Sequence, residues 1–577
     1  MATNQAPERP HRPALTLQIG TTGHRTLPNA DGAALQAHAT TLFRDAAAAV
    51  ARLHAVDQAS PAPVFAASPP LLRCLCGLAP GADTILAEAA IAQGWALTAV
   101  LPFARLEYER DFAAADVPRF QTLLHQATIV AELPGDRTRG GEPYADIGRQ
   151  IVEQSDILLA IWDGRPPRGP GGTGDVVQQA QDRGTPVAVI PAAGAASLAW
   201  LDTPPGGDFI DAIVATAVLP PADHSGFPQA YYDEIVAPAP WAATAVRWFE
   251  RAVLAGAPRP PVQPPPPTAA ESAAAPASLP ADAPEHQVEA AFAVADRLAG
   301  HYAARYRAAG LMRYGLVIPA TLGSFIGNFG PGWAAPFGYA LQFASLIAVL
   351  AFSARSNWSR DQRRFIAYRA LAEYLRNARL LMLLGASIAP PRVPAHQERV
   401  ADWAGWYGRG ILRQAGLPGR FSDAAVVARA RHAIRAAAWD EIAFLRGRAT
   451  RFSALARRLR LIGISLTIIG FALVAIHAAM LFVGGGPGVI HMLNELALVL
   501  PAMAPVFLGL LEFGDYGRLS TRYAAVAAEL EAGVTALDRA APSRGGVLSV
   551  ARRITDVMLA EGADWQLLIK ARTMSAF

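Results

Sequence analysis

The stretch YGLVIPATLGSFIGNFGPGWAAPFGYALQFASLIAVLAFSA, from Tyr314 to Ala354, contains no charged side chain, and it decides the architecture of this chain. A membrane-spanning helix needs roughly 20 apolar residues, so the stretch is too long for one span and about right for two. Midway lies Gly330-Pro331-Gly332-Trp333, which predicts a turn with an aromatic residue suited to the membrane–water interface. The stretch therefore predicts a helical hairpin with spans over about 314–330 and 335–353. The alternative is a buried hairpin in the core of a large soluble domain.

Arginines gather on both sides of this stretch and are absent within it. Because basic residues next to membrane spans stay in the cytoplasm, both flanks are predicted to be cytoplasmic and the turn to lie outside. The arginines that carry this inference are Arg305, Arg307 and Arg313 before the stretch, and Arg355, Arg360, Arg363 and Arg364 after it.

The composition agrees with a membrane protein that has several domains. Hydrophobic residues make up 52% of the 577 residues and charged residues 17%, which is unusual for a soluble protein. The net charge of +4 gives no reason to expect a nucleic-acid partner. Residues 1–13 contain no apolar core segment, so no signal peptide is expected. The spacing of Cys74 and Cys76 fits neither a zinc knuckle nor a C-x-x-C redox motif, and we expect buried thiols, with no metal and no cofactor.

Residues 1–254 alternate strand-like and helix-like segments, which predicts a Rossmann-like, doubly wound parallel α/β sheet. Glycine-bearing loops at residues 20–25, 77–83 and 170–178 follow three of these strands. Ligands bind beyond the carboxyl ends of such strands, and bare backbone at a helix N-terminus suits a phosphate. The alternatives are glycines needed for packing alone and Asp83 as a plain helix cap. The predicted ligand-binding residues are Gly20, Thr21, Thr22, Gly23, His24, Arg25, Gly77, Gly81, Ala82, Asp83, Gly171, Gly172, Thr173, Gly174 and Asp175.

Two motifs in this region carry a family resemblance. Gly77-Leu78-Ala79-Pro80-Gly81-Ala82-Asp83, followed by a helix and an apolar strand, resembles the SLOG superfamily, which includes the DNA-processing protein A fold and the LOG phosphoribohydrolases. Residues 170–178 are similar to the LOG signature P-G-G-x-G-T-x-x-E. Asp175 stands where that family has Thr, and Gln178 stands where it has the catalytic Glu. The resemblance implies a nucleotide-class ligand, whereas the missing carboxylate argues against catalysis.

After a Pro- and Ala-rich segment at 255–286, predicted to be a semi-stiff linker, the chain contains two similar helical modules. The first covers 287–384 and includes the hairpin described above, and the second covers 430–577, with a connector at 385–429 between them. The second module has predicted spans over about 461–483 and 493–511, separated by a glycine–proline turn. The second half is thus predicted to be an all-α membrane domain with four transmembrane helices in two hairpins.

This arrangement resembles the SLATT family of two-transmembrane effector modules, which occur with SLOG domains in bacterial conflict systems. The residues that carry the resemblance are Tyr302, Tyr306, Trp358, Tyr368, Glu373, Tyr523 and Trp565. It implies a membrane effector that oligomerises and forms pores or perturbs the bilayer.

Two ionisable residues fall within the spans of the second hairpin. Glu495 lies near the start of the fourth span and His477 well inside the third. Such residues are functional candidates by default, so both are candidates to line a pore. The alternatives are a Glu495 that reaches back to the interface and a neutral His477 that makes a structural hydrogen bond.

Together these patterns predict a multi-pass protein of the bacterial inner membrane, with both termini cytoplasmic. The two family resemblances imply that a nucleotide-derived small molecule gates it and that homo-oligomers disrupt the membrane in antiphage defence. Because a Pro-rich linker transmits force poorly, gating is expected through self-association of the first domains. One alternative is a membrane-tethered nucleotide N-glycosidase or phosphoribohydrolase. Another is a transporter or scaffold, although polar residues in the spans are few.

Overall fold

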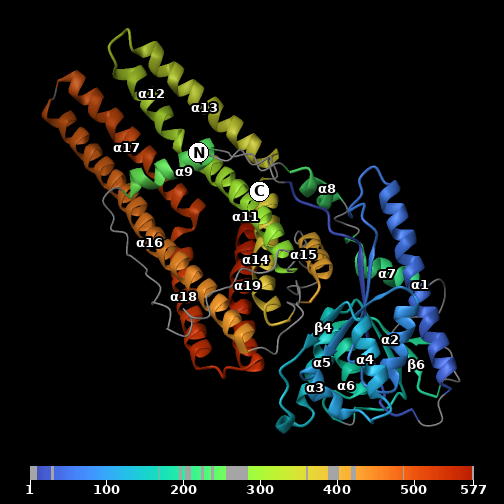
Figure 1. Cartoon of the computed structure of the whole chain (residues 1–577). Coiled ribbons are helices and arrows are strands. Elements are labelled where there is room, and N and C mark those ends of the chain that lie inside the picture. The colour runs from blue at the N-terminus through green and yellow to red at the C-terminus, as the bar shows by residue number, and fades with distance from the viewer. Residues whose placement is uncertain are drawn as a thin grey trace, which may run out of the picture.

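The computed structural model describes residues 9–27, 31–167, 169–193, 198–201, 209–221, 226–234, 240–254, 284–358, 361–386, 402–417, 424–484 and 486–574. The predicted linker lies outside them as far as residue 283, and so does Arg360. Figure 1 shows two parts, an α/β domain and a long helical assembly whose far end points away from the sheet.

Within the described residues, the strands form one sheet in the order β4-β3-β2-β1-β5-β6-β7. Every neighbouring pair is parallel except β6 and β7, which are antiparallel. The predicted parallel α/β sheet is therefore confirmed. The strands are β1 Thr16–Gly23, β2 Leu71–Cys76, β3 Ala96–Leu101, β4 Ile129–Glu132, β5 Ile157–Trp162, β6 Val187–Pro191 and β7 Ala199–Trp200.

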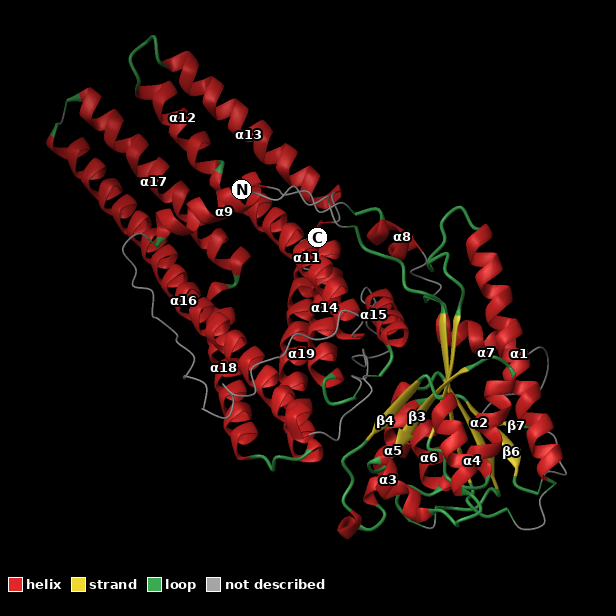
Figure 2. Cartoon of the chain, in the orientation of Figure 1, coloured by secondary structure: helices red, strands yellow, loops and turns green. Residues whose placement is uncertain are grey.

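Helices cover both faces of the sheet, as Figure 2 shows. Alternate residues of β5 point to opposite faces: Leu159 belongs to the core beneath α1 and α2, and Leu158 to the core beneath α5 and α6. This explains why β5 is a continuous apolar run. The helices of this part are α1 Gly32–Ala59, α2 Ala82–Ala92, α3 Arg105–Tyr108, α4 Val117–Gln126, α5 Glu142–Gln154, α6 Thr173–Arg183, α7 Phe209–Val218, α8 Gly226–Tyr232 and α9 Pro240–Val253, with 3-10 turns η1 Glu109–Asp111 and η2 Arg137–Arg139.

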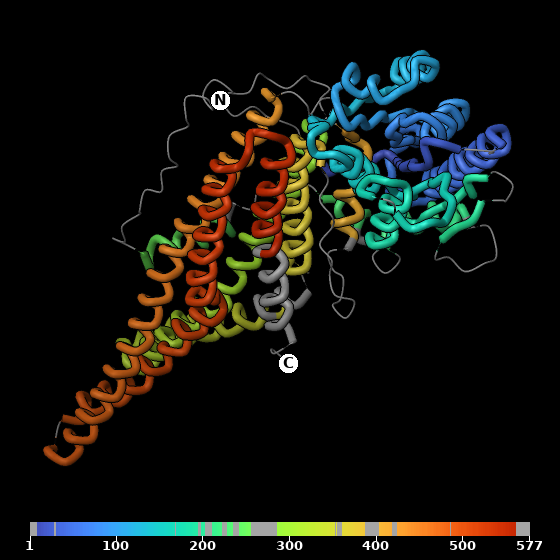
Figure 3. The backbone as a smooth tube through the Cα atoms, turned by 90° about the horizontal axis from the view of Figure 1, so that it is seen from below, coloured from blue at the N-terminus to red at the C-terminus, as the bar shows by residue number. Residues whose placement is uncertain are grey.

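The second half of the chain is helical throughout its described residues. Its helices are α11 Pro284–Gly315, α12 Val317–Phe329, α13 Ala335–Trp358, α14 Asp361–Met382, α15 Asp402–Ala415, α16 Ala424–Val483, α17 Pro487–Gly514, α18 Tyr516–Arg539 and α19 Arg544–Met574. The pairs α12–α13 and α16–α17 are hairpins that extend side by side away from the sheet (Figures 1 and 3). Residues 430–460 and 461–483, predicted as a helix followed by a span, form one continuous helix within α16.

Among the residues that the structure describes, three helical segments are long and apolar enough to cross a membrane, namely Glu285–Phe329, Ala424–Val483 and Pro487–Arg539. The apolar helix over Ala335–Ala351 is shorter, so the four predicted spans are supported in part. Large apolar side chains on these helices are exposed, among them Phe471 at 72% and Phe482 at 93%. Such a surface is unfavourable in water and suits a membrane.

Glycines bring the two helices of the first hairpin into close contact. A Cβ atom on Gly338 of α13 would lie 2.4 Å from the backbone nitrogen of Gly327 and 2.7 Å from the carbonyl oxygen of Gly323, both on α12. Gly323 and Gly327 are four residues apart, the spacing of small residues at membrane helix interfaces. Packing against a neighbouring backbone therefore explains the glycines of this hairpin.

The helical assembly contacts the α/β domain directly. Helix α15, which lies in the predicted connector, packs against β1 near its amino end. Arg413 of α15 forms an ion pair with buried Asp156, and Trp406 donates a hydrogen bond to the carbonyl oxygen of Val218 at 2.6 Å. One hydrophobic core runs from the sheet into α11, α14 and α15. The two halves are thus joined by packing as well as by the chain.

Candidate functional site

A polar cleft of about 230 Å³ opens at the carboxyl ends of β1, β2 and β5. In the sheet order, β2, β3 and β4 extend to one side of β1, and β5, β6 and β7 extend to the other. Ligands of doubly wound sheets bind where the strand order reverses in this way. The cleft is therefore the candidate ligand site of the α/β domain.

Most of the predicted ligand-binding residues line this cleft. The eleven that do are Thr21, Thr22, Gly23, His24, Arg25, Gly77, Asp83, Gly171, Gly172, Thr173 and Gly174. The other four, Gly20, Gly81, Ala82 and Asp175, are not among its lining residues. Gly81, for example, has φ +88°, and a Cβ there would lie 2.3 Å from the carbonyl oxygen of Arg25. Its role is to let the loop that precedes α2 pack against the loop that follows β1.

The loop before α6 forms one wall of the cleft. Gly171 has φ +77°, and a Cβ there would lie 2.4 Å from the backbone nitrogen of Ala145. At Gly172, by contrast, a Cβ would meet only the carbonyl oxygen of Gly169, at 3.3 Å. The side chain of Asp175 accepts a hydrogen bond from the N–H of Gly171 at 2.8 Å. Asp175 therefore braces this loop, and Gly172 is the position where a larger side chain fits the fold.

The first turn of α6 faces the cleft. This helix begins at Thr173, with Gly172 as its N-cap, and both residues line the cleft together with Gly174. The first N–H groups of a helix have no partners within it and carry the positive end of its dipole. The wall formed by this turn is therefore suited to an anionic group such as a phosphate.

Asp83 supplies a buried carboxylate on the opposite wall. Its side chain accepts a hydrogen bond from the N–H of Ala79 at 3.2 Å through Oδ2, whereas Oδ1 has no hydrogen-bond partner among the residues that the structure describes. Burial raises the pKa of Asp83 to about 7, and the Ala79 N–H and the nearby Arg25 charge oppose this rise. An orphaned buried oxygen is costly. It is satisfied if a ligand hydroxyl or amine donates to it.

Side chains from three other loops complete the cleft. His24 Nε2 lies 3.0 Å from Oδ1 of Asp163, which directly follows β5. The guanidinium of Arg25 lies 4.7 Å from the ring centroid of Tyr144 on α5, and the Tyr144 hydroxyl donates to Asp111. Arg165 also lines the cleft. Sequence reasoning did not identify Tyr144, Asp163 or Arg165, although the position of Asp163 and Arg165 just after a buried strand was a usable signal.

Gln178, at the position of the LOG catalytic Glu, does not line the cleft. Its side chain is exposed on α6 and donates a hydrogen bond to Asp182 at 2.9 Å. A carboxylate there would need a different rotation of α6 to reach a ligand in the cleft. Asp83 is the buried acidic group that the cleft does present.

The side chains that most often bind metal ions are scattered among the residues that the structure describes. Within the described part of the chain, no group of three His, Cys, Asp or Glu side chains could hold a metal ion. Cys74 and Cys76 are both buried and free, as expected, and burial raises the pKa of the Cys74 thiol. These thiols therefore pack within the sheet rather than act as nucleophiles.

The two candidates in the membrane helices differ in their surroundings. His477 Nδ1 of α16 lies 3.1 Å from the carbonyl oxygen of Ile490 on α17. This contact joins α16 and α17 near the turn of the hairpin, which is a structural role for His477. Glu495 is half-buried on α17.

The sequence matches no model of a known protein family and no curated protein. The function of this protein is therefore inferred from the cleft, the membrane helices and the contacts between them.

Proposed function

We propose that this protein is a membrane effector gated by a nucleotide-derived signal, which its α/β domain binds in the cleft at the ends of β1, β2 and β5. On binding, the membrane helices would open or assemble into a pore in the bacterial inner membrane, as in an antiphage conflict system. The proposal includes four spans, cytoplasmic termini and a homo-oligomeric active state.

The chemistry of the cleft supports a nucleotide-class ligand. The N-terminal turn of α6, together with Arg25 and Arg165, suits a phosphate group. The free Oδ1 of Asp83 suits a ribose hydroxyl on the opposite wall. A phosphate and a sugar held at the switch point of the sheet are the recurrent features of nucleotide sites in this fold.

The observation that carries the gating proposal is that one helix, α5, belongs to both the cleft and the helical assembly. Gln150 and Glu153 of this helix contact α19: Arg544 donates to Gln150 Oε1 at 3.0 Å, and Arg552 to Glu153 Oε1 at 2.7 Å. Its cleft-lining residues are Tyr144, Ile147, Gly148 and Ile151. A ligand that moves α5 would therefore also move α19.

From α19 the connection continues to the membrane helices. Arg544 also donates to the carbonyl oxygen of Leu384, which follows α14. Helix α19 packs against α14 and α18, which follow the two hairpins directly in sequence. This is a route within one subunit, which the composition of the linker did not suggest. A ligand shifts the equilibrium between two conformations of these helices only if it binds the two conformations with different affinity.

The test uses the full chain, because its core is shared between the two halves. Small molecules that copurify with the detergent-solubilised protein are identified by mass spectrometry and compared between the wild type and Gly172→Val. The variant should lose a nucleotide-class molecule and should no longer depolarise cells that express it at equal membrane levels. Gly32→Val is the control, because Gly32 lies away from the cleft and a Cβ there meets no atom within 4 Å. Depolarisation by Gly172→Val equal to that by the wild type would refute gating by the cleft.

One observation favours a second function, a nucleotide N-glycosidase tethered to the membrane. A buried carboxyl with a pKa near 7, such as Asp83, is suited to donate a proton to a leaving base. In that reaction the N-glycosidic bond breaks, water adds to the sugar carbon, and the base leaves with a proton. Release of free base from a nucleoside monophosphate by the full chain, lost in Asp83→Asn, would establish this enzyme in place of the sensor.

A further inference from the structure

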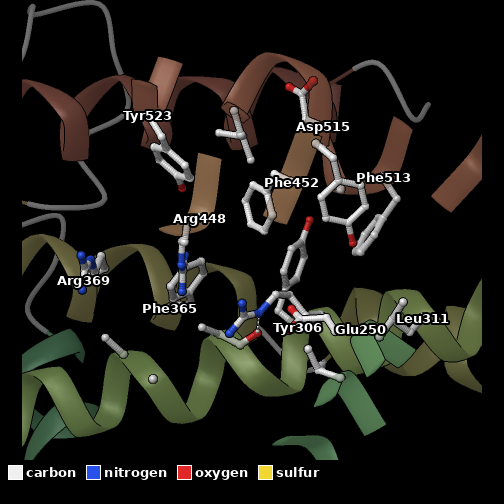
Figure 4. Close-up of a pocket in the computed structure, with 18 of the residues that line it drawn as sticks. Glu250, Tyr306, Leu311, Phe365, Arg369, Arg448, Phe452, Phe513, Asp515 and Tyr523 are labelled. Atoms are coloured by element: carbon white, nitrogen blue, oxygen red, sulfur yellow. Dashed lines mark hydrogen bonds between the residues drawn. The ribbon is translucent and has the colours of Figure 1, made fainter. Parts of the chain in front are cut away.

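A second cavity, of about 260 Å³, lies among the cytoplasmic ends of the membrane helices. Residues of α9, α11, α14, α16, α17 and α18 line it, so it is formed between the two helical modules (Figure 4). The sequence analysis did not anticipate it. Neither of the functions proposed above uses it.

The labelled arginines and the large apolar side chains of this cavity lie towards different ends. In Figure 4, Arg369 and Arg448 lie towards one end of the view, and Leu311 and Phe513 towards the other. Phe513 fits closely against α11, because a Cβ on Gly310 would lie 2.0 Å from its ring. This end combines closely packed aromatic and aliphatic groups with two carboxylates, Asp515 and Glu250, which lie towards the same side of the view in Figure 4.

Three arginines, Arg307, Arg369 and Arg448, line this cavity together with three acidic residues, Glu250, Asp296 and Asp515. Arg369 is paired with Asp296 and Glu373, which leaves Arg307 and Arg448 as the candidates to hold an anion. Among the described residues, neither Arg307 nor Arg448 forms an ion pair with a carboxylate. Arg307 Nε donates to the carbonyl oxygen of Ala303 at 3.2 Å, and the guanidinium of Arg448 lies 4.4 Å from the ring centroid of Phe444. Burial lowers the pKa of Arg307, and the charge of Arg448 lowers it further, against the opposing effect of Glu250. An anion between these two arginines would relieve their repulsion.

An adjoining cavity of about 320 Å³ extends this basic surface. It shares Arg307 and Arg448 with the first cavity and adds Arg247 and Arg451. Glu250 is the one acidic residue among the described residues that line it. Four arginines against one glutamate make a site for an anion with more than one negative oxygen.

The orientation of this cavity matches an inner-leaflet lipid. Leu311 and Phe513 stand next to the predicted spans, whereas Arg448 lies about 18 Å along α16 from Arg460 at the membrane boundary. Under the proposed topology the arginines face the cytoplasm and the end with Leu311 and Phe513 faces the bilayer. Basic pockets between membrane helices on the cytoplasmic side are suited to anionic lipid headgroups.

We propose that this cavity binds one anionic phospholipid, with its phosphate between Arg307 and Arg448 and its acyl chains directed past Leu311 and Phe513 to the bilayer. The lipid would bridge α11 of the first module and α16 of the second. The site is independent of the nucleotide cleft, so either can fail without the other.

The test is native mass spectrometry of the full chain in a non-ionic detergent, titrated with phosphatidylglycerol or phosphatidylcholine. We expect one tightly bound phosphatidylglycerol and at least about tenfold weaker binding of phosphatidylcholine. The double variant Arg307→Gln/Arg448→Gln should weaken phosphatidylglycerol binding by about tenfold or more. Arg460→Gln is the matched control, since this exposed arginine lies at the same boundary and outside the cavity. Equal loss in Arg460→Gln and in the double variant would show nonspecific surface attraction and would overturn the site.

A second variant keeps every charge and fills the cavity. Gly300 lines it on the side of Arg307 away from Leu311, and a Cβ there meets no atom within 4 Å, so Gly300→Leu should fold and displace the lipid headgroup, while Gly300→Ala retains binding. Unchanged lipid binding in Gly300→Leu would overturn the proposal. Glycerol 1-phosphate distinguishes a lipid from a soluble anion of the same headgroup chemistry. If it displaces the bound lipid at equal concentration, the site serves a free anion and the lipid assignment is wrong.

Discussion

The two cavities have similar volumes, about 230 and 260 Å³, but are built from different parts of the chain. The cleft of the α/β domain owes one wall to backbone, namely the glycine loop before α6 and the first turn of that helix. The cavity among the helices consists of side chains, with arginines at one end and aromatic rings at the other. The first should therefore be sensitive to added atoms and the second to removed charges. The predictions below test that distinction.

The largest effect is expected from Gly171→Val. Its positive φ and the 2.4 Å approach to the Ala145 nitrogen combine backbone strain with a clash, so we expect a loss of about 4 kcal/mol in the free energy of unfolding. Gly164→Ala is the control, because Gly164 has a similar φ of +76° with no atom within 4 Å and should lose only about 1 kcal/mol. Chemical denaturation of the purified full chain measures both. Equal losses would mean that the loop before α6 is not held by backbone packing.

The next effect concerns the dependence of stability on pH. The folded pKa of Asp83 is about 7 against an ordinary value of 3.8, so between these values the folded chain keeps a proton that the unfolded chain has lost. The contribution is therefore fully present below about pH 4 and declines as the pH rises to about 7, by roughly 4 kcal/mol in total. Asp83→Asn should remove this decline. An unchanged slope in the variant would show that Asp83 is not buried as described.

A smaller effect on the free energy of unfolding is expected at Arg544, which connects α5 of the α/β domain to the helical assembly. This buried arginine keeps its charge at neutral pH, although burial lowers its pKa to about 10. Arg544→Gln should cost about 2 kcal/mol, because the carbonyl of Leu384 and the side chain of Gln150 lose their donor. The exposed Arg446–Glu531 pair gives the control, and Arg446→Gln should cost less than about 1 kcal/mol. If a nucleotide still raises the melting temperature of Arg544→Gln but no longer changes the crosslinking of its hairpins, the Arg544 contact connects the cleft to the membrane helices.

The smallest effect has the opposite sign. Arg307→Gln should raise the free energy of unfolding in lipid-free detergent by less than about 1 kcal/mol, since it removes a buried charge next to Arg448. Added phosphatidylglycerol should reverse the order and stabilise the wild type more. If Arg307→Gln is destabilising without lipid, its charge serves the fold and the contrast between the two cavities is weakened.

The same contrast explains what the sequence could predict. The cleft was predicted because its glycines directly follow strands, and parallel strands bring their carboxyl ends to one edge. Tyr144 was missed because its direction depends on the rotation of α5 against the sheet. The helical cavity was missed entirely, since Val246, Tyr306, Arg448 and Tyr523 are far apart in the chain and only tertiary packing brings them together.

The organisation of the helices was predicted in part. The apolar stretches identified the hairpins, although the shorter described helix in the region 335–353 supports that span less strongly than the others. The helical run over 430–460 and the span over 461–483 join without a break in α16, because the change from charged to apolar residues there includes no helix-breaking residue. Helix α15 was treated as part of a connector, because nothing in its sequence shows that it docks against β1.

The unbroken course of α16 has a mechanical consequence. A helix of 60 residues is about 90 Å long, and in this protein it runs from the bundle next to the α/β domain to the tip of its hairpin. With no joint at the membrane boundary, a tilt of its base passes undiminished to its tip, and a rotation of a few degrees displaces the tip by several ångströms. The helix would therefore tilt as one rigid body about the point where it crosses the membrane boundary. Small movements at its base would become large ones at the opposite face of the membrane.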